Sequence, residues 1–213
     1  MTKASVSGDV IILHFDFAVR SAAGPVYEGN TYFGFFSRAG LADQQGIKDA
    51  RLHQPAPGGE GFPFPAGPPY PTGNLRMIDR ISPFEPRGGP AGLGFIRGIK
   101  EIYPEAWFFK AHFYQDPVWP GSLGLEAFLQ LLQALAVERW RPGESARFES
   151  AARDVGHSWV YRGQATPSNR RAAVEATVKR IDDRQRLIVA DGYLSVDGLA
   201  VYRINDFALR LIE

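Results

Sequence analysis

Residues 123–140 read LGLEAFLQLLQALAVERW, and this stretch decides the fold. Apolar side chains fall on nearly every side of a helix formed by these residues, and a helix that is hydrophobic almost all round is a buried one. The sequence Arg141-Pro142-Gly143 stops the helix, because proline cannot continue it and glycine favours its end. We therefore predict one long central helix, roughly residues 122–140.

The segments on either side of this helix favour strands. We predict a strand at residues 75–81, a turn at residues 86–92 and a strand near residues 94–102 before it, and a structureless approach then leads to the helix. After the helix we predict strands around residues 159–161, 174–178, 187–196 and 200–212, with turns at Asp182-Asp183 and Asp197-Gly198. One buried helix followed by a long antiparallel meander predicts an α+β chain whose sheet wraps around that helix.

The N-terminal segment reads as a separate element. Residues 9–36 alternate as a hairpin with a break at residues 22–25, and Ser37 is a candidate cap for a short helix to about Ile47. The pair Val26-Tyr27 parallels Val201-Tyr202 in the last hairpin. Two hairpins with aromatic strands can look alike, but a true repeat would make residues 1–47 the tail of a preceding copy of the same domain.

Residues 48–73 form a linker or arm. The run from Gln54 to Gly73 holds too many prolines for a sheet interior or a helix, yet Phe62, Phe64 and Tyr70 lie within it. Because a flexible tether is normally rich in glycine and serine, we predict an arm that lies against a protein surface. Residues 74–213 then make up the main domain.

The composition excludes several functions. The chain has 213 residues, with 24 Lys and Arg against 23 Asp and Glu, so no strong field attracts nucleic acid. It has no cysteine, which excludes disulfides and thiolate chemistry. No His, Asp and Glu combination has metal-ligand spacing, and nowhere do 18 apolar residues run together. We predict a cytoplasmic protein without a metal, a cofactor or a membrane partner.

Residues that can perform chemistry gather at the start of the central helix. His112 precedes a rigid stretch with two prolines, Gly121 and Ser122 begin the helix, and Glu126 lies about one turn inside it. A histidine and a buried carboxyl group can act as base and acid, and the free N–H groups of a helix N-terminus can stabilise an oxyanion. Gly121 allows a ligand carbonyl to approach the backbone closely. This set suits the removal of water from a 3-hydroxyacyl thioester.

Residues 107–131, WFFKAHFYQDPVWPGSLGLEAFLQL, closely resemble the signature of bacterial 3-hydroxyacyl-acyl-carrier-protein dehydratases of the hot-dog fold, the FabA type. The resemblance runs from the LRMIDR segment at residues 75–80 to Ile212. It implies that His112 is the catalytic base, that Glu126 is the acid, and that the Gly121 amide polarises the thioester carbonyl. Glu126 replaces the aspartate of the FabA type and Ser122 replaces its cysteine, so the resemblance implies dehydration but not double-bond isomerisation.

The chain looks most like the tandem dehydratase domains of bacterial polyunsaturated fatty acid synthases. This resemblance rests on the sequence of residues 112–126, on the segment PPYPTGNLRMIDR at residues 68–80 and on the preceding hairpin. In that family the base and the acid of one site come from two different hot dogs. The resemblance therefore implies a homodimer or a tandem pseudo-dimer, with substrates carried on an acyl carrier protein.

The same sequence is compatible with two other functions. A hot-dog thioesterase would use the same helix-borne carboxylate but release free acid, and a non-catalytic scaffold copy would retain the fold without activity. Phe113 and Trp119 are candidates for the lining of an acyl tunnel, although large apolar residues are core by default. We expect His14, His53 and His157 to be structural, and Asp79 to form a structural pair with Arg76 or Arg80.

Overall fold

The computed structural model describes residues 1–42, 45–55 and 61–212. Its contacts divide the chain into two compact units, Met1–Gln44 and Gln45–Glu213, which are described separately below.

The first unit is a three-stranded antiparallel sheet in the order β1-β2-β3. Its strands are β1 (Lys3–Ser7), β2 (Val10–Ser21) and β3 (Gly24–Phe35), so the hairpin predicted for residues 9–36 is confirmed and β1 adds to it. The Ser37 hydroxyl accepts a hydrogen bond of 3.2 Å from the Gly40 N–H at the start of α1 (Arg38–Ala42), which ends well before Ile47. None of the residues in this unit whose burial is described is buried.

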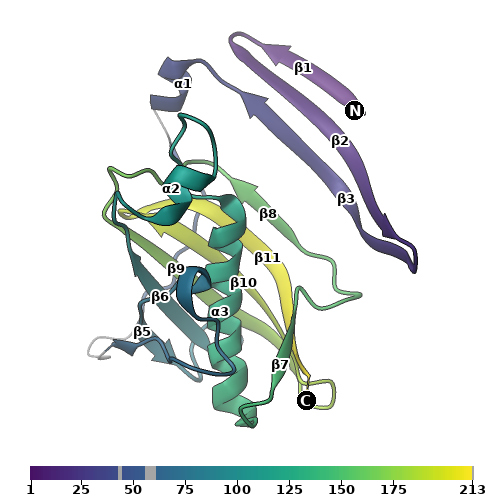
Figure 1. The fold of residues 1–213 in the computed structure, drawn as a ribbon, viewed down its shortest axis with the longest axis vertical. Helices are drawn as coiled ribbons and strands as arrows, with labels where there is room; N and C mark the ends of the chain where they lie inside the picture. The colour runs from purple at the N-terminus through teal and green to yellow at the C-terminus, as the bar shows by residue number, and fades with distance from the viewer. Residues whose placement is uncertain (43–44, 56–60, 213) are drawn as a thin grey trace. The chain divides into compact units, whose positions relative to one another are not determined.

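The second unit is a large antiparallel sheet that holds a single long helix, α3 (Gly121–Trp140), against one face (Figure 1). The strand order is β4-β5-β6-β9-β10-β11-β7, and β8 also pairs with β11. The strands are β4 (Phe62–Pro63), β5 (Arg80–Glu85), β6 (Phe95–Glu101), β7 (Arg147–Ser150), β8 (Ser158–Tyr161), β9 (Arg171–Asp182), β10 (Leu187–Val196) and β11 (Leu199–Ile212).

The core lies between α3 and the sheet, as the sequence predicts. Phe128, Leu131 and Leu132 on the helix have no exposed surface, and burying a side chain of this size stabilises the fold by about 1.5–3 kcal/mol. Gly98 on β6 allows the helix to approach closely, because a Cβ atom there would lie 2.7 Å from the Leu131 Cδ2. The prediction of a buried central helix is confirmed.

The strand predicted at residues 75–81 is wrong over residues 75–79. Gly73–Leu75 form a short 3₁₀ helix, η1, and the strand begins only at Arg80. The Gln130 side chain from α3 accepts a hydrogen bond from the Met77 N–H and donates one to the Leu75 carbonyl, at 2.9 and 2.6 Å. A side chain thus satisfies backbone groups that a strand would pair in a ladder.

The approach to α3 is not structureless either, since it contains the short helix α2 (Trp107–Ala111). The described part of the Pro-rich arm lies against the protein as predicted: Phe64 is buried and the Tyr70 ring meets it edge-on at 5.2 Å. Residues 56–60 of this arm lie outside the described residues. Asp79 pairs with Lys100 at 2.8 Å and not with either predicted arginine, because Arg76 donates to the Phe64 carbonyl instead.

Candidate active site

His112 lies at the C-terminal end of α2, on the segment that leads into α3. Its Nδ1 is 3.3 Å from the Val118 carbonyl oxygen, and its ring stacks on Phe113 with the centroids 3.9 Å apart. A carbonyl oxygen can only accept a hydrogen bond, so this contact requires the proton of a neutral imidazole to be on Nδ1. The lone pair of Nε2 is then available to take up a proton from a ligand.

Gly121 is the first residue of α3 and lies at an open helix N-terminus. The preceding residue, Pro120, makes no side-chain capping bond, and its carbonyl oxygen accepts from the Leu123 and Gly124 N–H groups. The first N–H groups of a helix have no partner within the helix, and the positive end of the helix dipole lies there. Gly121 therefore offers a backbone donor suited to a carbonyl oxygen that gains negative charge.

Glu126 lies in the second turn of α3 and is partly exposed, although apolar residues surround it in the sequence. Its Oε1 accepts a hydrogen bond of 2.9 Å from Gln130 Nε2, one helical turn further on. Gln130 has no exposed surface and is held by η1 and Met77 at the same time. The orientation of the Glu126 carboxyl group is therefore fixed by a side chain that cannot itself move freely.

The structure brings Gly121 and Glu126 together on one helix and places His112 on the segment before it. Among the residues that the structure describes, no hydrogen bond joins His112 to Glu126. Trp119 is buried beside Phe108, with the ring centroids 5.1 Å apart, whereas Phe113 is 55% exposed. Their role in a tunnel stays a prediction.

The sequence did not predict that two further residues, Gln130 and Tyr161, contact the residues of this site. Gln130 has a partial signal, because it is a polar side chain four residues after Glu126 in an apolar helix, a spacing at which helical side chains meet. Tyr161 has no local signal: it reaches Gly121 from a strand 40 positions later in the chain.

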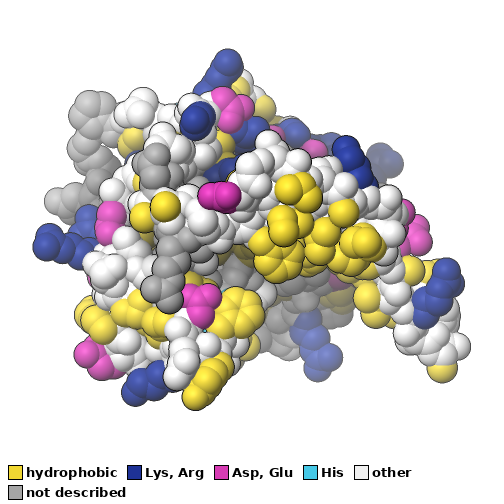
Figure 2. Space-filling model, turned by 90° about the horizontal axis from the view of Figure 1, so that it is seen from above, with side chains coloured by type: hydrophobic (Ala, Val, Ile, Leu, Met, Phe, Trp, Pro, Cys, Tyr) yellow, Lys and Arg dark blue, Asp and Glu magenta, His cyan; other side chains and the backbone are white. Residues whose placement is uncertain are grey.

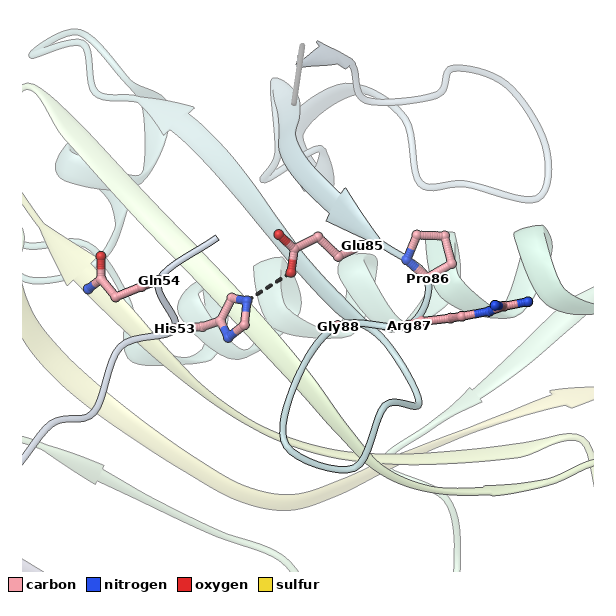
Figure 3. A pocket seen from close by; sticks show the side chains of 6 residues that line it. All are labelled: His53, Gln54, Glu85, Pro86, Arg87 and Gly88. Carbon is pink, nitrogen blue, oxygen red and sulfur yellow. Dashed lines mark hydrogen bonds and ion pairs between the residues drawn. The ribbon is translucent and has the colours of Figure 1, made fainter. Parts of the chain in front are cut away.

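Two pockets of about 530 and 680 Å³ lie elsewhere, and His112, Gly121 and Glu126 line neither of them. The lining of the larger pocket includes Arg97 and Glu175, which alternate along the strands with residues that face α3, so this pocket lies on the opposite face of the sheet. In the smaller pocket His53 Nε2 lies 2.8 Å from Glu85 Oε2 (Figure 3). The His53 backbone also binds Glu175 and Arg97, so this histidine fastens the arm to the sheet.

The remaining histidines are packed as structural residues. The His14 ring lies 5.6 Å from Tyr32 and the His157 ring 4.2 Å from Phe207. Across the described ranges, no cluster of three His, Asp or Glu side chains is arranged to share a metal ion. In the same ranges, no helix has both the length and the apolar character needed to span a bilayer.

An antiparallel sheet wrapped around one buried helix, with a polar site at the start of that helix, defines a hot-dog domain. The chain belongs to the FabA-like family, because the model of the FabA-like domain matches residues 70–205. It is also 32% identical over 244 residues to a polyunsaturated fatty acid synthase subunit of Thraustochytrium sp. (strain ATCC 26185 / S-3). That match covers 99% of this chain, which spans 16% of the length of the relative.

Solved structures resemble the chain more distantly. The dehydratase heterocomplex ApeI:P from Xenorhabdus doucetiae superposes with a TM-score of 0.46 at 11% identity, covering 67% of this chain and 86% of that one. A putative thioesterase, yhdA, from Lactococcus lactis has a TM-score of 0.42 at 8% identity and covers 62% of this chain and 94% of its own.

Proposed function

We propose that this chain carries a dehydratase that removes water from 3-hydroxyacyl thioesters on an acyl carrier protein and yields trans-2-enoyl thioesters. The observation that carries the proposal is the arrangement on α3: an open N-terminus at Gly121 and, one turn on, a carboxyl group held by the buried amide of Gln130. Membership of the FabA-like family supports the same reaction.

The chemistry follows from three groups. The Nε2 of His112 takes the proton from the α-carbon of the substrate, and the electron pair forms the new double bond as the bond from the β-carbon to its hydroxyl oxygen breaks. Glu126 gives a proton to the departing hydroxide, which leaves as water. The Gly121 N–H and the helix dipole stabilise the negative charge that develops on the thioester oxygen.

The site needs a second hot dog in this proposal. The family resemblance implies that the base and the acid of one site come from two hot dogs, so His112 and Glu126 would each meet its partner from another copy, in a homodimer or a tandem pseudo-dimer. Strand β8, which is four residues long and pairs with β11, leaves a sheet edge at which another copy could pair.

The first unit supports a tandem arrangement. Val26-Tyr27 are the third and fourth residues of β3, and Val201-Tyr202 occupy the same two positions of β11. Both strands are the second strand of a hairpin with a two-residue turn. Hydrophobic side chains lie exposed along β2 and β3, and such side chains gather on the face that Figure 2 draws. A three-stranded sheet in which no residue of described burial is buried is marginal alone, so we infer that it closes a preceding hot dog.

The test is incubation of the full chain with short and long 3-hydroxyacyl thioesters, with mass analysis for the loss of water and a thiol assay for hydrolysis. We expect enoyl thioester and no free thiol. His112→Ala and Glu126→Gln should each lower the turnover by about 10²–10⁴-fold, the usual contribution of one acid or base. His14→Ala is the matched control, because His14 lies on β2 in the other unit.

Unchanged turnover in His112→Ala, with a native circular dichroism spectrum, would refute the proposed roles. Release of free thiol without enoyl product would favour the thioesterase. Complete absence of both products at every chain length would favour the scaffold copy.

A further inference from the structure

Two glycines in the first turn of α3 make room for two tyrosine rings. A Cβ atom at Gly121 would overlap the hydroxyl group of Tyr161 and lie 2.8 Å from its Cε2. A Cβ atom at Gly124 would overlap the Tyr202 ring and lie 3.1 Å from its Cδ2. The Tyr161 hydroxyl therefore lies against the residue whose N–H opens the helix.

The two tyrosines are neighbours on adjacent strands. Tyr161 ends β8 and pairs in register with Tyr202 of β11, and their rings meet nearly perpendicular with the centroids 4.3 Å apart. Tyr202 is 4% exposed, whereas Tyr161 is 39% exposed. Tyr202 is thus an anchor within the core, and Tyr161 extends from it to the surface at the start of α3.

The hydroxyl group of Tyr161 can act as a donor. A phenol carries one proton and two acceptor lone pairs. Because this hydroxyl group lies where a Cβ atom at Gly121 would be, it is next to the start of α3 and can donate its proton to an acceptor that binds there.

Burial favours the neutral form of this phenol. It raises the pKa of Tyr161, and the hydrogen bonds from Tyr202 and Trp159 offset only part of the increase. The group therefore keeps its proton at neutral pH. A protonated phenol hydroxyl therefore lies beside Gly121, the first residue of α3.

We propose that Tyr161 is a second hydrogen-bond donor to the thioester carbonyl oxygen, beside the N–H of Gly121. This inference rests on the proposed function, because it assumes that a thioester carbonyl binds at the start of α3. A carbonyl oxygen has two lone pairs, so one accepts from the backbone and the other from the phenol. Two donors stabilise the enolate-like oxygen more than either does alone.

The test compares Tyr161→Phe with Tyr193→Phe in the full chain. Phenylalanine keeps the ring that packs against Gly121 and removes only the hydroxyl group. Tyr193 pairs with Glu175 on the face of the sheet away from α3, so its substitution is the matched control. Removing one oxyanion donor lowers kcat by about 10²–10³-fold, and we expect about 10²-fold for Tyr161→Phe because Gly121 remains. KM should change little, and the control should behave as the wild type.

A second readout does not depend on turnover. A saturated acyl thioester labelled with ¹³C at the carbonyl cannot lose water, so its carbonyl stretching frequency can be measured while it is bound. Donation lowers this frequency, and we expect Tyr161→Phe to return part of the shift while the Tyr193→Phe control keeps all of it.

The outcomes separate the two proposals. Wild-type kcat and an unchanged carbonyl frequency in Tyr161→Phe would overturn the role of Tyr161 and leave dehydration intact. A wild type that releases no water, yet shows a Tyr161-dependent frequency shift, would overturn dehydration and support the contact. No frequency shift on binding to the wild type would overturn the role of Tyr161.

Discussion

Gln130→Leu should destabilise the protein far more than Gln133→Leu, although both replace a buried glutamine on α3 three residues apart. Gln130 has no exposed surface and makes three hydrogen bonds, with Met77, Leu75 and Glu126. Gln133 is 7% exposed, and its Oε1 has no hydrogen-bond partner in the described part of the chain. The two positions therefore test hydrogen bonding with the burial of the side chain held nearly constant.

The magnitude follows from the groups left behind. Leucine at position 130 leaves the Met77 N–H without a partner, and Met77 is 2% exposed, so this costs about 1–3 kcal/mol. The other two bonds contribute about 1 kcal/mol each, and the burial of an apolar side chain offsets about 1 kcal/mol of the total. We expect a loss of about 3 kcal/mol, or a fall in Tm of about 6–12 °C for a chain of this size. Gln133→Leu should change the stability by about 0–1 kcal/mol in the stabilising direction, because it removes an unpaired oxygen.

The assay is urea unfolding of both variants, followed by circular dichroism and checked by thermal melting. Equal losses in the two variants would refute the reasoning, as would a Gln130→Leu protein within about 0.5 kcal/mol of the wild type. Gln130→Glu adds a finer test, because it keeps an acceptor for the Met77 N–H but removes the donors to Glu126 and to the Leu75 carbonyl. In the proposed dehydration, its kcat should fall even under conditions in which the variant stays folded.

Two further predictions concern the opposite face of the sheet and the arm. Glu175→Gln removes one charge of the ion pair with Arg97. The N–O distance of this pair is 2.7 Å and the Glu175 side chain is 6% exposed, so we expect a loss of about 3 kcal/mol of stability in urea unfolding. We also expect faster proteolysis of residues 45–55, and a wild-type stability would contradict the reasoning. Burial, with a smaller contribution from the Glu138 charge, raises the pKa of Tyr70 to about 12. Its folded pKa exceeds the unfolded value of about 10, so its contribution to stability is complete below pH ~10 and is lost as the pH rises toward ~12. Tyr70→Phe should flatten this alkaline fall, and an unchanged slope would contradict the assignment.

The helix and most strands could be predicted because their signals are local. A helix of this length that is apolar on nearly every side is stable only in the protein core. Strands separated by turn residues are recognised from the alternation of apolar and polar side chains. Residues 75–81 could not be predicted in the same way. Their backbone partner is the side chain of Gln130, which lies 55 positions from Leu75, and no local pattern contains that contact.

The residues of the candidate site also fall into a group that local sequence reveals and a group that only the fold reveals. His112, Gly121 and Glu126 lie within 15 consecutive residues, so their spacing and the family resemblance were enough to nominate them. Gln130 and Tyr161 act on those residues from within the fold. Their contribution depends on where η1 and β8 meet α3, and that meeting is a tertiary property.

Sequence and structure give separate reasons for a glycine at position 121. The sequence predicts glycine there because a ligand carbonyl must approach the backbone, and the structure supplies a second reason, because the Tyr161 hydroxyl lies in the space that a side chain would fill. Any residue larger than glycine would displace the phenol and obstruct the open N–H together. If the phenol is a donor, this substitution removes two interactions with the carbonyl at once. Its effect on kcat should then exceed that of Tyr161→Phe, which removes only one.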